Sequence, residues 1–115
     1  MVKQGDIIKV NFNPQARHEQ PGYRPALVIN NNFFNQKTNL TIVCPITNTN
    51  NRFPLHIPLD NRTETTGVIL CEHVKALDLN ARSYKIVEQL PKDLLEKVID
   101  VVFCEIEILS EEDSK

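Results

Sequence analysis

The feature that most constrains the fold of this chain is a change in its hydrophobic period near residue 90. Before that point the apolar residues come in short runs, several of which alternate with polar residues as β-strands do. After it they recur at the spacing of one face of an α-helix, at Leu94, Leu95, Val98, Val101 and Val102. Pro91 suits the first turn of that helix. The pattern predicts a mainly β fold, a small barrel or curled sheet with a C-terminal helical cover.

The strands are predicted over residues 6–13, 26–29, 40–46, 55–59, 68–71, 74–77 and 84–87. In the first of them Ile8, Val10 and Phe12 share one face. Prolines on either side of Ile57 favour an edge strand. Asparagines are concentrated in residues 30–51, which predicts turns there.

The length of 115 residues predicts a single domain over 1–115, with the acidic residues 110–115 as a frayed tail. The formal net charge is −2, which excludes a protein that coats nucleic acid indiscriminately. The charge is uneven, however. Residues 1–52 carry six Lys and Arg against two acids, whereas residues 91–115 carry three against eight. We therefore expect a basic face with the acidic helix turned away from it.

The three cysteines, Cys44, Cys71 and Cys104, lie in or beside apolar runs, and we expect them to be buried free thiols of a reducing compartment. No apolar stretch is long enough to span a bilayer, so the protein is predicted to be cytoplasmic.

No cofactor or metal is predicted. Three glycines cannot build a nucleotide-binding loop, there is no Cys-x-x-Cys pair, and the histidines are scattered at His18, His56 and His73.

Two residues suit phosphate chemistry. Arg24 lies between a polar loop and a strand, where Pro25 restrains it, and its guanidinium is a fork that matches phosphate oxygens. Thr47 follows a strand and can offer a hydroxyl to the same phosphate. The alternatives are an ordinary surface arginine and a threonine that caps a turn.

These residues belong to a longer series that resembles the MazF/PemK family of toxins. The series comprises Gly5-Asp6-Ile7-Ile8, Pro14, Glu19-Gln20-x-Gly22-x-Arg24-Pro25, Pro45-x-Thr47, Gly67-Val68 and Glu72-His73-Val74-Lys75-x-Leu77-Asp78. The resemblance implies an SH3-like barrel of the MazF/CcdB/Kid type with a C-terminal helix. It also implies a homodimeric, metal-independent endoribonuclease that cuts single-stranded RNA and is held inactive by a cognate antitoxin.

Carried over by position, the resemblance makes Arg24 and Thr47 the catalytic pair. Glu72 falls where PemK-like members place an acidic residue proposed as the base, but Leu70 stands where those members have an arginine. This departure favours the scheme based on Arg24 and Thr47. The proton acceptor stays open among His18, Glu19 and Glu72.

The resemblance also places the loop of His18, Glu19 and Gln20 along the RNA groove. Arg17, where many members have glycine, can add a phosphate contact. Gln20, Asn48 and His73 are candidates for reading base edges, against turn formation for Asn48 and strand packing for His73.

The implied reaction needs no metal, because the 2′-hydroxyl of RNA is itself the nucleophile and the products are a 2′,3′-cyclic phosphate and a 5′-hydroxyl. Two other functions are compatible with the same barrel: a toxin that binds a protein target such as gyrase and cleaves nothing, and an RNA-binding barrel without activity. The second would be expected to expose more aromatic residues for base stacking.

Overall fold

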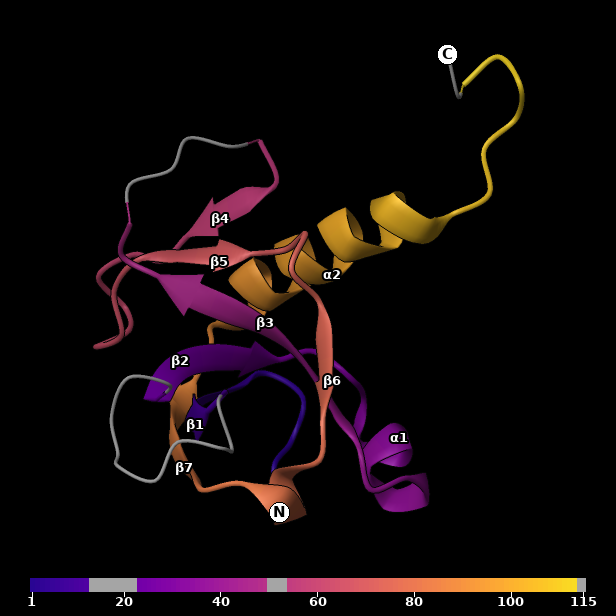
Figure 1. Cartoon of the computed structure of the whole chain (residues 1–115). Coiled ribbons are helices and arrows are strands. Elements are labelled where there is room, and N and C mark those ends of the chain that lie inside the picture. The colour runs from indigo at the N-terminus through magenta and orange to yellow at the C-terminus, as the bar shows by residue number, and fades with distance from the viewer. Residues whose placement is uncertain (13–22, 50–53, 114–115) are drawn as a thin grey trace.

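A computed structural model describes residues 1–12, 23–49 and 54–113 (Figure 1). Seven strands, two helices and one 3₁₀ turn follow one another along the described chain. In order they are β1 (Asp6–Asn11), β2 (Tyr23–Val28), α1 (Asn32–Lys37), β3 (Thr41–Thr47), β4 (His56–Pro58), β5 (Val68–Leu70), β6 (Lys75–Leu77), η1 (Leu79–Ala81), β7 (Tyr84–Gln89) and α2 (Lys92–Ile106).

The strands form one antiparallel sheet in the order β4-β5-β3-β2-β1-β7, and β6 pairs with the other end of β3. The prediction of a mainly β fold with a C-terminal helix is confirmed. The sheet does not close into a complete barrel, since β4 and β7 are its two edges and do not pair with each other in the described part. β4 is an edge strand, as the prolines around Ile57 predicted.

The central strands are buried on both faces. Ile7 and Ile8 are neighbours on β1 and point to opposite faces, yet neither is exposed to solvent. Ile7 belongs to the cluster that α2 covers, whereas Ile8 packs in a second cluster with Leu77 and Leu79. Because both faces are covered, these strands include continuous apolar runs such as residues 26–29.

The helix α2 packs as its periodicity predicted, with Leu94 and Val98 buried against the sheet (Figure 1). Burial raises the pKa of Cys44 and of Cys71 to about 12, so both remain protonated thiols. The prediction that Cys104 is buried is wrong: it is a free thiol on the exposed side of α2. It lies six residues after Val98, which places it about 240° around the helix from that buried side chain.

The asparagine-rich stretch contains the helix α1, where the sequence predicted turns. The Asn31 side chain caps it by accepting a hydrogen bond from the Phe34 backbone N–H at 2.9 Å. No residue of this helix is buried, which explains why it has no apolar face to detect. Asn30 joins the helix to the sheet, since it donates to Asn35 Oδ1 and accepts from the Ile42 backbone N–H, both at 2.8 Å.

The loop between β4 and β5 is held by Glu88 of β7. Its carboxylate accepts hydrogen bonds from the Glu64 backbone N–H at 3.1 Å and from the backbone N–H and hydroxyl of Thr65 at 2.8 and 2.7 Å. Burial by itself would raise the pKa of Glu88, but these hydrogen bonds outweigh it and lower the pKa below 4.5.

The substitution Glu88→Gln is therefore expected to lower the free energy of unfolding by about 1 kcal/mol at neutral pH. Because the folded protein lowers this pKa, the stabilisation is present above the ordinary pKa and is lost as the pH falls through the folded value. Urea unfolding between pH 3 and 7 measures both effects. Glu64→Gln is the matched control, and an equal loss at pH 3 and pH 7 would contradict the assignment.

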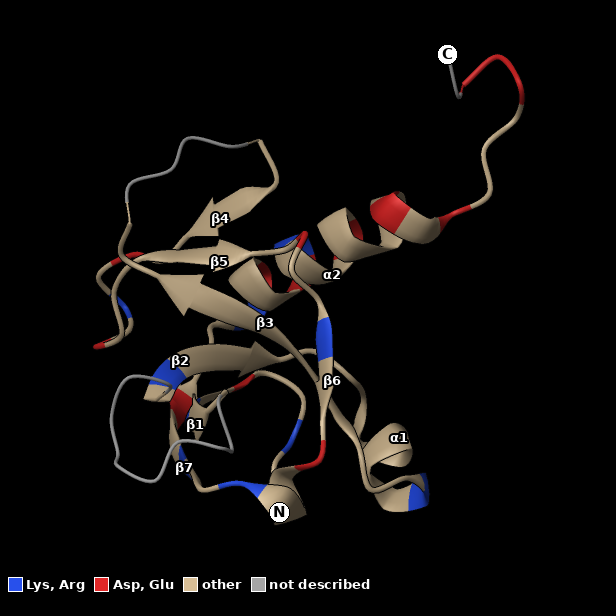
Figure 2. Cartoon of the chain, viewed as in Figure 1, with Lys and Arg blue, Asp and Glu red and all other residues tan. Residues whose placement is uncertain are grey.

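Lysine and arginine residues lie on β2 and β6, and acidic residues lie along the C-terminal segment and on α2, which carries basic residues as well (Figure 2). Among the described residues, no helix has both the length and the apolar character needed to cross a membrane.

Candidate functional site

A pocket of about 380 Å³ lies where the ends of β3 and β5 meet the starts of β2, β4 and β6. The residues that line it are Phe12, Arg24, Pro45, Ile46, Thr47, Thr49, His56, Leu70, Glu72, His73 and Lys75. Four of the residues singled out from the sequence thus come together in one pocket, although they lie on separate strands and turns.

Arg24 and Thr47 are both available to a ligand. Arg24 is exposed at the start of β2, where it pairs with Val10 of β1, and its side chain makes no hydrogen bond or ion pair with another described residue. Thr47 ends β3 half-buried, and its hydroxyl oxygen accepts a hydrogen bond from the Thr49 backbone N–H at 3.1 Å. The hydroxyl proton of Thr47 can therefore still be donated, so both residues can bind an anion such as a phosphate.

The position of Thr47 depends on Gly67. Thr47 pairs with Val68 across β3 and β5, and the preceding Gly67 has a φ of +116°, which residues with a side chain rarely adopt. A Cβ at this position would overlap the carbonyl oxygen of Thr47. The glycine therefore lets β5 approach the end of β3 closely enough to fix the threonine.

The substitution Gly67→Ala is expected to lower the free energy of unfolding by at least about 2 kcal/mol, because it adds backbone strain and a clash with backbone atoms. Urea unfolding provides the measurement. Gly5→Ala is the matched control, since Gly5 also has a positive φ but a Cβ there would meet only side chains of Gln89 and Leu95. Equal losses in the two variants would contradict a special role for the contact with Thr47.

The carboxylate of Glu72 lies between two imidazoles. Its Oε2 atom is 2.8 Å from Nε2 of His56 and 3.5 Å from Nε2 of His73. Its Oε1 atom is buried and has no hydrogen-bond partner among the described residues. Burial by itself would raise the pKa of Glu72, but the hydrogen bond with His56 and the nearby imidazoles lower it, so Glu72 remains a carboxylate at neutral pH.

His56 and Lys75 are pocket residues that the sequence did not single out as functional. Lys75 adds a second cation near Arg24, which increases the preference of the pocket for anions. The contact between His56 and Glu72 spans sixteen residues and corresponds to no spacing motif. It arises because His56 pairs with Leu70 across β4 and β5, two residues before Glu72.

The predicted site residue Asn48 lies outside this pocket. Asn48 lines a neighbouring pocket with Lys9 and Thr66, and its Oδ1 accepts a hydrogen bond from the Thr66 hydroxyl at 3.0 Å. Arg17, His18, Glu19 and Gln20 lie outside the described residues.

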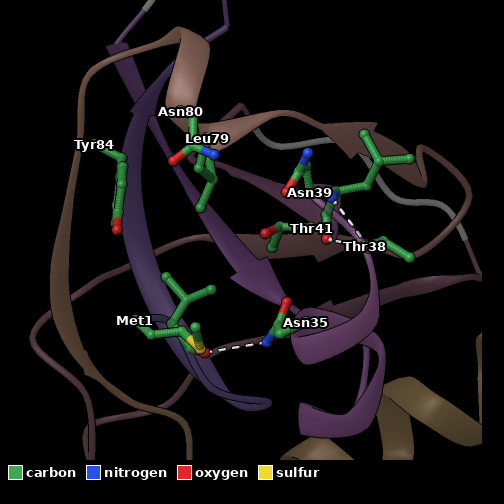
Figure 3. A pocket seen from close by; sticks show the side chains of 10 residues that line it. Met1, Asn35, Thr38, Asn39, Thr41, Leu79, Asn80 and Tyr84 are labelled. Atoms are coloured by element: carbon green, nitrogen blue, oxygen red, sulfur yellow. Dashed lines mark hydrogen bonds between the residues drawn. The ribbon is translucent and has the colours of Figure 1, made fainter.

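A third pocket, of about 280 Å³, lies among residues near the N-terminus, α1 and η1 (Figure 3). Its lining includes Asn35, Asn39, Asn80 and Tyr84 and contains no charged side chain or histidine, so it lacks the cationic side chains of the pocket around Arg24. Over residues 1–12, 23–49 and 54–113, no group of three or more His, Cys, Asp or Glu side chains could hold a metal ion.

The fold and the pocket define a small antiparallel β protein with two cationic side chains and a threonine hydroxyl gathered in one pocket. Residues 3–102 match the PemK-like, MazF-like toxin of type II toxin–antitoxin system, and the chain belongs to this family. It is 33% identical over 102 residues to the endoribonuclease PemK of Escherichia coli, covering 85% of this chain and 77% of that protein. It is 35% identical over 105 residues to the endoribonuclease toxin ChpB of Escherichia coli K12, with coverages of 84% and 87%.

Solved structures agree with this assignment. MazF from Deinococcus radiodurans superimposes with a TM-score of 0.78 at 33% identity, covering 90% of this chain and 94% of that one. A MazE–MazF structure from the same organism gives a TM-score of 0.77 at 27% identity over 90% of this chain and 93% of that one. The family resemblance expected from the sequence is therefore confirmed.

Proposed function

We propose that this chain is the toxin of a toxin–antitoxin pair and acts as a sequence-specific, metal-independent endoribonuclease on single-stranded RNA. The observation that carries the proposal is one pocket in which Arg24 and Thr47 both present donors that no other described residue uses, beside an ionised Glu72. A protein that only binds another protein would not need such phosphate-directed groups at the ends of two strands.

RNA supplies its own nucleophile, so the protein must hold the 2′-oxygen in line with the leaving 5′-oxygen. Negative charge develops on the phosphoryl oxygens as the new bond forms. The guanidinium of Arg24 and the hydroxyl of Thr47 stabilise that charge, and donors of this kind are worth about 3 kcal/mol each in a preorganised site. The products are a 2′,3′-cyclic phosphate and a 5′-hydroxyl.

Lys75 extends the cationic surface next to Arg24 and suits a neighbouring phosphate of the same strand. We further propose that Arg17 binds phosphate and that Gln20 and Asn48 read the edges of unstacked bases beside the pocket. The sequence-based candidates for the proton acceptor are His18, Glu19 and Glu72. Of these, Glu72 lies in the described pocket.

As for partners, we propose a homodimer inhibited by a cognate antitoxin in the bacterial cytoplasm. The family description, a toxin of a toxin–antitoxin system, supports the inhibitor. An inhibitory segment that is acidic or apolar would occupy the RNA groove, because the pocket carries Arg24 and Lys75 beside Phe12 and Ile46.

Incubation with a long single-stranded RNA in excess EDTA tests the activity. We expect cuts at a small set of positions sharing a short sequence, and each downstream product should carry a 5′-hydroxyl. Mapping of the 5′ ends gives the measurement. Binding without cuts would favour an inactive RNA-binding barrel. Neither binding nor cuts would favour a toxin directed at a protein target.

A further inference from the structure

The arrangement of two imidazoles on one carboxylate oxygen assigns a role that the family resemblance did not supply. His56 and His73 both approach Oε2 of Glu72, but from very different environments. The side chain of His56 is 4% exposed, that of Glu72 is 24% exposed and that of His73 is 55% exposed. All three groups line the pocket, and the exposed fraction rises from His56 through Glu72 to His73, so His73 is the most open of them to a substrate.

We propose that His73 accepts the proton of the attacking 2′-hydroxyl, with Glu72 orienting the imidazole and His56 holding Glu72 in place. This proposal deepens the ribonuclease activity proposed above and rests on it. It gives His73, which the sequence suggested as a base-reading residue, a place in the chemistry instead.

The geometry at His73 suits this role. Its backbone N–H donates to the Leu70 carbonyl at 3.0 Å, which fixes the turn after β5. Its Nε2 faces Glu72, and its Nδ1 makes no hydrogen bond with any other described residue. In the tautomer that carries its proton on Nε2, beside the carboxylate, Nδ1 has the lone pair that can take a proton. The 3.5 Å separation is longer than a good hydrogen bond, and such contacts commonly tighten when substrate binds.

Glu72 is less suited to accept the proton itself. Its Oε2 is already engaged by His56, and its Oε1 is buried away from solvent. The lowered pKa of Glu72 also makes it a weak base at neutral pH. A fixed carboxylate beside a histidine instead orients the imidazole and stabilises the imidazolium that forms.

His56 acts through Glu72 and is a positioning residue. The pairing of His56 with Leu70 across β4 and β5 directs its ring to the carboxylate from the protein interior. Its Nε2 lies 2.8 Å from Oε2 of Glu72, the shorter of the two imidazole contacts. Because it is almost fully buried, it stabilises the carboxylate without reaching the substrate.

The step balances without a metal or a further reagent. The 2′-oxygen forms a bond to phosphorus while its proton passes to Nδ1 of His73, and the bond from phosphorus to the 5′-oxygen breaks. The 5′-oxygen takes a proton from water, and the hydroxide so formed removes the proton from the His73 imidazolium. The enzyme returns to its starting state, and no atom is gained or lost from the RNA besides the exchange of protons.

The test uses the full chain and a short RNA that contains one mapped cut site, with kcat and KM measured for each variant. His73→Gln keeps a side chain that can form a hydrogen bond with a nucleobase but cannot exchange protons near neutral pH. We expect its kcat to fall about 100- to 10,000-fold while KM changes less than about threefold. In His73→Ala, added imidazole should restore part of the lost kcat, which no structural role would predict.

The positioning role is tested at His56. His56→Gln can still donate to Oε2 of Glu72 and should retain kcat within about tenfold, whereas His56→Leu should lose about ten- to a hundredfold. Thermal unfolding of every variant reports on folding, and the exposed substitution Lys37→Gln serves as the control with unchanged kcat.

Two outcomes would overturn the proposal: an unchanged kcat for His73→Gln, whether or not KM rises, or no effect of imidazole on His73→Ala. The Arg24→Ala variant distinguishes the ribonuclease proposal from the proposed role of His73. If Arg24→Ala is inactive and His73→Gln is fully active, the ribonuclease proposal stands and the role of His73 is wrong. If the unsubstituted protein cuts no RNA, both fall together.

Discussion

Arg24→Ala is expected to lower the rate of RNA cleavage at least about 1,000-fold. It removes the charged donor that stabilises negative charge on the phosphoryl oxygens, as an oxyanion hole or an arginine finger does. Arg24 is exposed and its side chain makes no hydrogen bond or ion pair with another described residue, so its loss leaves no described polar group unpaired. The free energy of unfolding should change by less than about 0.5 kcal/mol. Single-turnover cleavage of an RNA with one mapped site, together with urea unfolding, measures both quantities.

Arg24→Lys is the companion variant. It keeps the positive charge but not the planar fork that contacts two phosphoryl oxygens, so we expect a rate between those of the unsubstituted protein and Arg24→Ala. Lys37→Gln, which changes a charge on α1, is the matched control. Cleavage by Arg24→Ala within threefold of the unsubstituted protein would refute the assignment of Arg24.

The second large effect lies in the substrate. Replacing the single ribose on the 5′ side of the scissile phosphate by 2′-deoxyribose removes the nucleophile and is expected to reduce cleavage at that site to background. The phosphates and bases that the protein binds are unchanged. The modified strand should therefore still compete with the all-RNA substrate, with an inhibition constant close to the KM of that substrate.

The same deoxy substitution one nucleotide further along provides the control, and cleavage should persist there. A cut at the modified position would mean that water rather than the 2′-hydroxyl attacks, and the product would then end in a linear phosphate instead of a cyclic one. That result would contradict the proposed mechanism, although the protein would still be a nuclease.

The main elements were predictable because they bury apolar side chains with a regular period. The positions of Leu94 and Val98 predicted the face of α2, and alternation or continuous apolar runs predicted the strands. The helix α1 was not predicted because none of its residues is buried, so its sequence has no hydrophobic period. Cys104 was misplaced because a cysteine near apolar residues on a helix can point to either side.

Part of the candidate site was likewise predictable from the sequence, and part was not. The short motifs around Arg24 and Thr47 indicate a phosphate site, since the residue types and their places at strand ends already imply the chemistry. The partner of Glu72 could not be read from the chain, because His56 meets it only when β4 pairs with β5. Residues 17–20, which the sequence also placed at the site, lie outside the described part of the chain.

The sequence by itself determined a mainly β chain with a terminal helix, the family to which it belongs, and the arginine and threonine suited to a phosphate. These follow from local periodicity and from short motifs, which depend only on neighbouring residues. The tertiary structure alone decided that a buried imidazole and an exposed imidazole meet one carboxylate in the pocket. It also decided that Gly67 allows β5 to approach Thr47. Both depend on the register of non-neighbouring strands, which arises from packing across the whole sheet.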